Sequence, residues 1–290
     1  AGVEEENIFN IFENYSIGKK HRERGNSRFE QLKKQIEKAK KYTGFREPRL
    51  MSMGEVLSSE KEFSFLIDNF WPLNENMILY GRGGVGKSLF ALNLALEIAS
   101  PSLDGFLGKY KVNQTGNVLI FQSENSIASY KNKFKLNDRL GACGLLNGYE
   151  IYFAQTGNDI MTNGNILNKL FYNYVLKMIK QAKPRLVIFD PLVSFHEEDE
   201  NSNVGMRNVL DKFTELAQDY ETNILIVHHD GKGKGQSEYS GGRGASAIGD
   251  WARNIIELSK KDPKNQIFEM KQLKSSNFEG FGQESICRNE

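Results

Sequence analysis

A glycine-rich segment between a predicted strand and a predicted helix constrains the fold of this chain more than any other feature. It reads Gly81-Arg82-Gly83-Gly84-Val85-Gly86-Lys87-Ser88, after an apolar run over residues 76–80 and before a helical pattern over residues 88–99. This spacing matches a phosphate-binding loop, in which consecutive backbone N–H groups surround phosphate oxygens at a helix N-terminus. The residues expected to bind the nucleotide are Gly81, Gly83, Gly84, Val85, Gly86, Lys87, Ser88 and Leu89.

The phosphate-binding loop predicts ATP and Mg²⁺ as the cofactors. In such loops the lysine reaches the β- and γ-phosphates, and the hydroxyl group that follows it coordinates the metal. We therefore expect Lys87 to act in catalysis and Ser88 to be a magnesium ligand. A glycine turn without a ligand is the alternative, and it is disfavoured because the flanking strand and helix stand where such a loop requires them.

Apolar runs and helical patterns alternate along the rest of the chain. Strands are predicted over residues 117–122, 150–154, 185–190, 223–228, 254–258 and 266–271. Helices are predicted from residue 167 to near Pro184 and over residues 206–220. Short continuous apolar strands that alternate with helices specify an α/β fold with a central, mainly parallel sheet flanked by helices. The last two strands follow each other directly, so we expect a hairpin-like edge at the C-terminal end.

A charged segment precedes this core. Residues 18–50 hold twelve Lys and Arg against four Glu, and Phe29, Leu32, Ile36 and Ala39 recur at helical spacing. This pattern predicts an amphipathic helix on an arm over residues 1–60, with the core at residues 61–290. The sequence leaves three environments open for this helix: solvent, a neighbouring subunit or nucleic acid.

Two acidic residues that follow predicted strands are candidates for catalysis. Asp190 ends one strand, and Glu124 comes shortly after another. The carboxyl ends of parallel strands share one edge of a sheet, and ligands bind at that edge. We expect Asp190 to hold Mg²⁺ through its water shell and Glu124 to be the base that orients the attacking water. A solvent-facing or helix-capping role is the alternative for Glu124.

Two histidines end the fourth predicted core strand. A polar residue at this position can contact the γ-phosphate and transmit its loss to the loop that follows. We assign this sensor role to His229 and a structural role to His228. A histidine that is merely packed in the core is the alternative for both positions.

A second cluster of glycines follows these histidines. Of the 27 glycines in the chain, seven lie between Gly231 and Gly249. Lys232, Lys234 and Arg243 stand on this backbone, which suits contact with DNA phosphates without base reading. A surface loop without a ligand is the alternative. The acidic run over residues 196–200 would repel a phosphate chain, so we expect it to contact a subunit or a cation instead.

Overall composition excludes several classes of protein. With 38 Lys plus Arg against 37 Asp plus Glu, the net charge is +1, which gives no overall indication of nucleic acid or membrane as a partner. No apolar run in the chain approaches the roughly 18 residues that a membrane span needs. Cys143 and Cys287 are too few for a zinc cluster or a disulfide framework. We expect a cytoplasmic protein without a membrane partner.

Together these motifs resemble the RecA-like core of the RepA-type plasmid and phage replicative helicases, which are related to the DnaB-type hexameric helicases and the KaiC-type ATPases. The similarity covers about residues 60–280. It rests on Phe65-Leu66-Ile67-Asp68 before Trp71-Pro72, the phosphate-binding loop, Val118 to Glu124, Phe189-Asp190-Pro191-Leu192 with Phe195-His196-Glu197-Glu198, His228-His229 before Lys232-Gly233, and Gly242-Arg243-Gly244-Ala245-Ser246. The acidic run and the histidine pair are more selective than the phosphate-binding loop alone.

The resemblance implies a homo-oligomeric ring, usually of six subunits, with ATP at the subunit interfaces and single-stranded DNA through the central hole. In such rings a neighbouring subunit inserts a cationic finger that stabilises charge on the transferring phosphoryl group. Arg253 matches this finger, and Lys274 matches a second one. Ser276 replaces an arginine that some relatives carry two positions after that lysine, which weakens the second assignment.

We therefore expect an ATP-hydrolysing DNA helicase that translocates on single-stranded DNA during phage or plasmid replication, in a bacterial cell or a phage-infected host. Because the chain begins at Ala1, we expect it to be part of a larger protein that carries a primase or polymerase. A non-translocating RecA- or KaiC-like ATPase switch or recombination-mediator scaffold is the alternative. A small-molecule kinase is disfavoured because the sequence has no visible acceptor pocket or lid motif.

Overall fold

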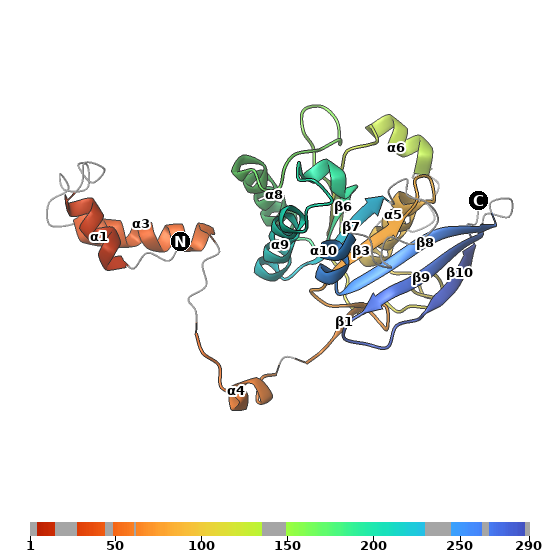
Figure 1. The fold of residues 1–290 in the computed structure, drawn as a ribbon, viewed down its shortest axis with the longest axis horizontal. Helices are drawn as coiled ribbons and strands as arrows, with labels where there is room; N and C mark the ends of the chain where they lie inside the picture. Colours follow the sequence, from red (N-terminus) through yellow and green to blue (C-terminus); the bar gives the residue numbers. More distant parts are fainter. Residues whose placement is uncertain are drawn as a thin grey trace. The chain divides into compact units, whose positions relative to one another are not determined.

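The computed structural model describes residues 5–14, 28–43, 49–60, 62–134, 149–229, 245–262 and 267–287. Contacts within the chain divide it into two compact units, Ala1–Lys61 and Glu62–Glu290 (Figure 1). The described part of the first unit is helical, and the second unit is built on a large sheet.

Helices α1 (Glu5–Asn14) and α3 (Arg28–Thr43) pack against each other in the first unit. The rings of Phe9 and Phe29 meet edge to face with centroids 5.5 Å apart. Leu32 and Ile36 are buried on one face of α3. The predicted amphipathic helix therefore forms, and part of its apolar face packs within its own unit.

Helix α4 (Met53–Leu57) closes the first unit and is stabilised locally. Ser52 Oγ accepts a hydrogen bond from the backbone N–H of Glu55, and the Glu55 carboxylate accepts one from the backbone N–H of Ser52 at 2.7 Å. Such a capping box satisfies two N–H groups that the helix itself leaves without acceptors. None of the five residues of α4 is buried.

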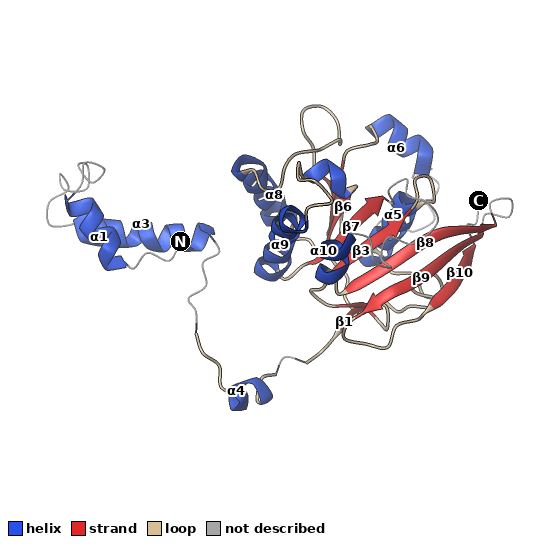
Figure 2. Cartoon of the chain, in the orientation of Figure 1, coloured by secondary structure: helices blue, strands red, loops and turns tan. Residues whose placement is uncertain are grey.

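An eight-stranded sheet forms the centre of the second unit, in the order β10-β9-β8-β3-β7-β6-β4-β5 (Figure 2). The pairs from β8 to β5 are all parallel, whereas β9 pairs antiparallel with both β8 and β10. The strands are β3 (Asn76–Gly81), β4 (Val118–Gln122), β5 (Ile151–Phe153), β6 (Leu186–Asp190), β7 (Asn223–His229), β8 (Asn254–Asp262), β9 (Ile267–Ser275) and β10 (Gln283–Cys287). The predicted RecA-like core with a mainly parallel sheet and a hairpin-like edge is confirmed.

Three strands of the structure, β1 (Phe65–Ile67), β2 (Trp71–Pro72) and β10, were not predicted from the sequence. β1 and β2 form a separate two-stranded sheet. They are only three and two residues long, too short for a periodic pattern. The third, β10, contains one aliphatic residue, Ile286, so no apolar run marks it in the sequence.

Helices cover both faces of the sheet. Alternate residues of β3, such as Ile78 and Tyr80, pack with residues of α8 (Lys169–Ala182), α9 (Asn203–Tyr220) and α10 (Ala245–Trp251). Their neighbours Met77 and Leu79 pack on the opposite face with α5 (Lys87–Ala99). Because side chains alternate along a strand, a continuous apolar strand supplies both cores at once.

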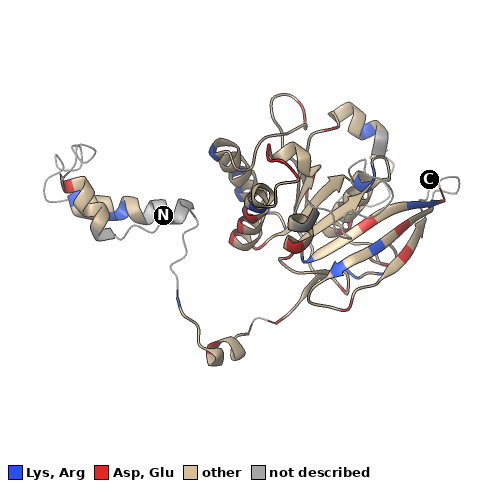
Figure 3. Ribbon diagram, viewed as in Figure 1, with Lys and Arg blue, Asp and Glu red and all other residues tan. Residues whose placement is uncertain are grey.

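Charged side chains are absent from the central strands β3 and β7 and present on strands toward the antiparallel edge of the sheet. The central strands β3 and β7 carry no Lys, Arg, Asp or Glu. Charged side chains of both signs lie along β8 and β9, toward the antiparallel edge (Figure 3). Among the described residues, no helix combines the length and the apolar character that crossing a bilayer requires.

Strand register brings the carboxyl ends of the parallel strands to one edge. Gly81 at the end of β3 pairs with His229 at the end of β7, and Gln122 at the end of β4 pairs with Asp190 at the end of β6. Asn254, the first residue of β8, pairs with Met77 at the start of β3, so it lies at the opposite edge. We call these the carboxyl edge and the amino edge of the sheet.

The close approach of β3 and β8 leads us to predict how a substitution at Gly81 changes the stability of the fold. A Cβ atom at this position would collide with the backbone carbonyl oxygen of Leu258. We expect Gly81→Ala to lower the free energy of unfolding by about 1–3 kcal/mol, as overpacking does. Gly83→Ala is the matched control, because a Cβ there meets no atom within 4 Å, and its expected effect is within about 0.5 kcal/mol. Denaturant unfolding measures both, and equal stability of the two variants would contradict this packing.

Candidate functional site

The glycine-rich loop connects β3 to α5 at the carboxyl edge. Gly84 and Gly86 adopt left-handed backbone conformations, with φ of 72° and 99°, which glycine adopts without strain. A Cβ at either position, or at Gly83, would meet no atom within 4 Å, so the space over the loop is open. The first turn of α5 has no side-chain cap and no acidic residue. These N–H groups and this open space fit the phosphates of a nucleotide.

Lys87 is buried at the start of α5. Its Nζ donates hydrogen bonds to the carbonyl oxygens of Gly81 at 2.6 Å and Arg82 at 3.0 Å, and it lies 3.3 Å from Nδ1 of His229. Burying a charged group costs free energy unless polar partners surround it, and the two carbonyl groups provide such partners. The lysine and the histidine thus meet although they are far apart in the sequence.

His229 lies between this lysine and Glu124. An ammonium group can only donate, so its contact with Nδ1 requires that nitrogen to be unprotonated and leaves the ring proton on Nε2. Nε2 lies 3.7 Å from Glu124 Oε1. Burial lowers the pKa of His229 below its ordinary value, the Lys87 charge lowers it further, and the Glu124 carboxylate opposes both effects. The imidazole is therefore neutral at pH 7.

Asp190 ends β6 two strands away from β3, a separation of about 10 Å at the usual strand spacing. Its side chain is buried. A carboxylate and the hydroxyl of Ser88 are hard oxygen donors, which fit Mg²⁺. Across the described residues, no group of three or more His, Cys, Asp or Glu is arranged to hold a metal. Mg²⁺ commonly takes one or two protein ligands and completes its shell with phosphate and water, so these two oxygen donors would be sufficient to hold it.

The turn that carries Glu124 is held by the side chain of Gln122. Gln122 Oε1 accepts a hydrogen bond from the backbone N–H of Asn125 at 2.9 Å, and Nε2 donates to the Asn125 carbonyl at 2.7 Å. Ser123 Oγ donates to Ser194 Oγ at 2.7 Å, which ties the turn to the 3₁₀ helix η3 (Leu192–Phe195). Glu124 itself stays half exposed. The polar end of an apolar strand was the only sequence signal for Gln122.

Tyr130 is a further buried residue near this edge. It lies on α6 (Ile127–Phe134) and packs edge to face on Phe153 with ring centroids 4.9 Å apart. Burial raises the pKa of the Tyr130 phenol, and the Asp190 charge raises it further. The hydroxyl group therefore stays protonated beside the aspartate. Nothing in the sequence marks this tyrosine, because α6 carries no motif.

The two predicted finger residues lie at the amino edge. Arg253 is exposed just before β8, and Lys274 is near the end of β9. The lysine Nζ donates to the carbonyl oxygens of Gly249 at 2.9 Å and Asp250 at 3.2 Å, and burial lowers its pKa. Both residues line a cavity of about 510 Å³ together with Glu75. This lysine therefore has a structural partner, the end of α10, in its own chain.

The structure thus brings Lys87, Glu124, Asp190 and His229 to one edge of the sheet. It does not bring Arg253 or Lys274 to that edge. The predicted DNA-binding residues Lys232, Lys234 and Arg243 lie outside the described residues.

An AAA-domain family model matches residues 45–235, which is more than half of the chain. The chain belongs to the AAA-domain family. The matched range of this AAA domain contains the phosphate-binding loop and the residues gathered at the carboxyl edge, and it ends before Arg253 and Lys274. The second unit is therefore a P-loop ATPase domain, which binds and hydrolyses nucleotide.

The contacts of His229 predict how its pKa responds to substitution. Lys87→Ala should raise the pKa of His229, because it removes a neighbouring positive charge, and Glu124→Gln should lower it, because it removes a negative one. NMR titration of labelled histidine measures both shifts. The pKa of His196, which burial lowers and Glu200 opposes, is the internal control and should not respond. Shifts of the same sign in both variants would contradict this arrangement.

Proposed function

We propose that this chain is the ATPase core of a ring-shaped DNA helicase, which hydrolyses ATP and translocates on single-stranded DNA. The observation that carries the proposal is the separation of the candidate residues between two edges of one sheet. The carboxyl edge has the phosphate-binding loop and the candidate base, whereas the candidate finger Arg253 lies at the amino edge. A second copy of the chain would complete each site.

The distance between the edges supports a contribution from a neighbouring subunit. The six residues of β3 span about 17 Å at about 3.3 Å per residue, which is longer than an arginine side chain. Arg253 therefore cannot reach the phosphate-binding loop of its own chain. A ring of copies, hexameric in the helicases that the sequence resembles, would place the amino edge of one subunit against the carboxyl edge of the next.

Each candidate residue that lies at the carboxyl edge has a proposed chemical role there. Lys87 and the loop N–H groups bind the phosphates, and Glu124, with its half-exposed carboxylate, orients the attacking water and accepts its proton. Ser88 and Asp190 would hold Mg²⁺, which would neutralise charge on the phosphates. His229 contacts both Lys87 and Glu124, so it responds when the lysine moves toward a phosphate.

Single-stranded DNA is the proposed partner. This part of the proposal rests on the resemblance to RepA-type helicases and on Lys232, Lys234 and Arg243 in the glycine-rich segment of the sequence after β7. Cations on a glycine-rich backbone can follow a phosphate chain without reading bases. His229 is the last residue of β7. We propose that loss of the γ-phosphate beside it is transmitted to the glycine-rich segment that follows and moves the bound DNA.

A non-translocating ATPase switch or assembly scaffold is the second candidate. The observation that favours it is α4, a capped helix without a single buried residue, on which Met53, Val56 and Leu57 are exposed. Exposed apolar side chains on a stable helix suit protein assembly. ATP-dependent assembly on DNA without directional movement would support this candidate.

Glu124→Gln tests the proposed base. The variant should bind ATP as tightly as the parent chain, whereas hydrolysis should fall by about 100-fold or more, because an amide cannot accept a proton from water. Steady-state phosphate release and equilibrium nucleotide binding measure the two properties. Glu150→Gln, on an exposed residue just before β5, is the matched control and should hydrolyse ATP normally. Retained hydrolysis in Glu124→Gln would exclude Glu124 as the base.

Arg253→Ala tests the proposed finger. Nucleotide binding should persist, and hydrolysis by the assembled protein should fall by about 10³-fold or more. Mixing with Lys87→Ala subunits should restore part of the activity, because some interfaces then contain an intact Lys87 and an intact Arg253. Arg207→Ala removes a guanidinium from the same cavity, where it pairs with Asp211 at 3.0 Å, and serves as the control. No recovery in demonstrably mixed oligomers would count against a finger that acts between subunits.

Strand separation distinguishes the two candidate functions. The parent protein should separate a forked duplex in the presence of ATP, and Lys87→Ala should not. ATP hydrolysis without stimulation by single-stranded DNA and without strand separation would reject the helicase and leave the P-loop ATPase assignment in place.

A further inference from the structure

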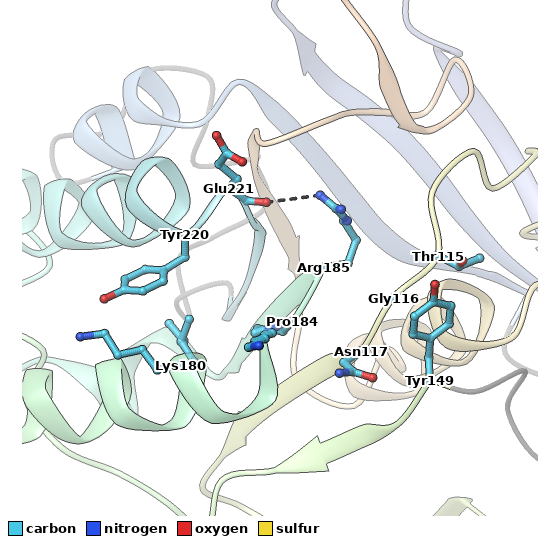
Figure 4. A pocket seen from close by; sticks show the side chains of 11 residues that line it. Thr115, Gly116, Asn117, Tyr149, Lys180, Pro184, Arg185, Tyr220 and Glu221 are labelled. Atoms are coloured by element: carbon cyan, nitrogen blue, oxygen red, sulfur yellow. Dashed lines mark hydrogen bonds between the residues drawn. The ribbon is translucent and has the colours of Figure 1, made fainter. Parts of the chain in front are cut away.

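A second cavity, of about 520 Å³, opens at the amino edge of the sheet (Figure 4). Its walls come from the residues just before β4 and β6 and from the C-terminal ends of α8 and α9. The phosphate-binding loop lies at the other edge, so this cavity is separate from the nucleotide site described above. Its volume falls within the range of small-molecule sites, about 300–1,000 Å³.

The walls of this cavity are held by specific contacts. Asn117 Nδ2 donates to the Ala182 carbonyl at 2.7 Å, and Asn117 Oδ1 accepts from the backbone N–H of Glu150 at 3.0 Å. A Cβ at Gly116 would lie 2.7 Å from Cβ of Arg185, so only glycine allows the arginine to lie against this segment. The arginine Nη1 donates to the Glu221 carbonyl at 3.4 Å. The guanidinium therefore lies at the wall of the cavity, beside the end of α9.

The cavity is positively charged. Lys180, Lys183 and Arg185 line it, against a single carboxylate, that of Glu221. Within the part of the chain that the structure describes, neither Lys183 nor Arg185 forms a salt bridge. The net positive charge therefore attracts an anion.

The lysine side chains at this cavity are not needed to cap the C-terminal ends of α8 and α9. The Ile179 carbonyl at the end of α8 accepts from the backbone N–H of Lys183 at 2.8 Å, and the Ala182 carbonyl accepts from Asn117. The Ala217 carbonyl of α9 accepts from the backbone N–H of Thr222 at 3.1 Å. Backbone and amide groups thus cap both helices, and the lysine ammonium groups are not needed as caps.

Two tyrosines distinguish the cavity from a simple anion site. Figure 4 shows Tyr220 and Tyr149 at opposite ends of the group, with Pro184 and Asn117 between them. Lys180 Nζ lies 5.9 Å from the centre of the Tyr220 ring. Aromatic faces beside cations bind nucleotides, because a base stacks on the ring while the phosphate contacts the cation. An acidic peptide would use the cations but would have no specific use for the two rings.

We propose that this cavity binds a nucleotide unit, with its phosphate at Lys183 and Arg185 and its base against a tyrosine ring. The unit comes either from a free nucleotide or from a single strand, and both present the same phosphate and base. The proposal does not rest on the helicase function, because it concerns the edge of the sheet opposite the phosphate-binding loop.

Anisotropy of a labelled short oligothymidylate tests the strand as the source. The full-length variant Lys183→Ala/Arg185→Ala should bind roughly tenfold more weakly, and the slope of log K against log salt should fall by about 0.7, as expected when contact with one phosphate is lost. Tyr220→Ala should also weaken binding, about tenfold, with an unchanged slope. Lys169→Ala/Lys177→Ala removes the same charge from exposed positions on α8 outside the cavity and should bind normally.

Calorimetry with AMP tests the free nucleotide as the source, since AMP has no β- or γ-phosphate for Lys87. If the cavity variant binds both probes more weakly, the cavity is a nucleotide site that accepts free nucleotides. If it binds only the oligonucleotide more weakly, the cavity is a site for single-stranded DNA. Unchanged binding of both probes, or an equal loss in the α8 control, overturns the proposal. Polyglutamate serves as the probe for an acidic peptide. The proposal is also overturned if the cavity variant binds polyglutamate more weakly but binds both nucleotide probes normally. An unchanged melting temperature and an unchanged rate of ATP hydrolysis in the absence of DNA show that each variant is folded.

Discussion

The parallel pairing of β3 with β7 is the contact on which the rest of the second unit depends. It sets Gly81 beside His229, and the loop that follows Gly81 then brings Lys87 Nζ to 3.3 Å from the histidine ring. Both strands are apolar over most of their length and buried on both faces, which fixes their register because a slip would expose core residues. The chemistry of the carboxyl edge thus depends on hydrophobic packing in the strands below it.

The amino edge is held by buried asparagines. Asn223 donates to the carbonyl oxygens of Pro72 at 2.8 Å and Glu75 at 3.1 Å, and Asn254 donates to that of Phe70 at 2.8 Å. Buried amides of this kind must be hydrogen-bonded, so they bind the segment between β1 and β3 firmly to the sheet. Their effect is to fix the cavity that contains Arg253. The two edges therefore have different supports, apolar strands at one and polar networks at the other.

The apolar segments were sufficient to predict the fold class, because a continuous apolar strand between helices is compatible with little besides a covered parallel sheet. They could not predict β10, which has only one aliphatic residue, or the short pair β1 and β2. For a similar reason, only some of the residues at the site could be predicted from the sequence. Charged residues at or after strand ends, such as Asp190 and Glu124, stand out in the sequence, whereas the contacts of Gln122 with Ile160 and of Tyr130 with Phe153 join segments that are far apart in the chain. Such contacts have no local pattern.

The sequence by itself determined the phosphate-binding loop, the alternation of strands and helices and the residues that end each strand, because these depend on local spacing and hydrophobicity. Only the tertiary structure decided which strand ends share an edge, since strand order and register depend on packing between segments distant in the chain. It separated Arg253 and Lys274 from the phosphate-binding loop by the length of β3. It also brought Lys183, Arg185 and Tyr220, which carry no sequence motif, to one cavity.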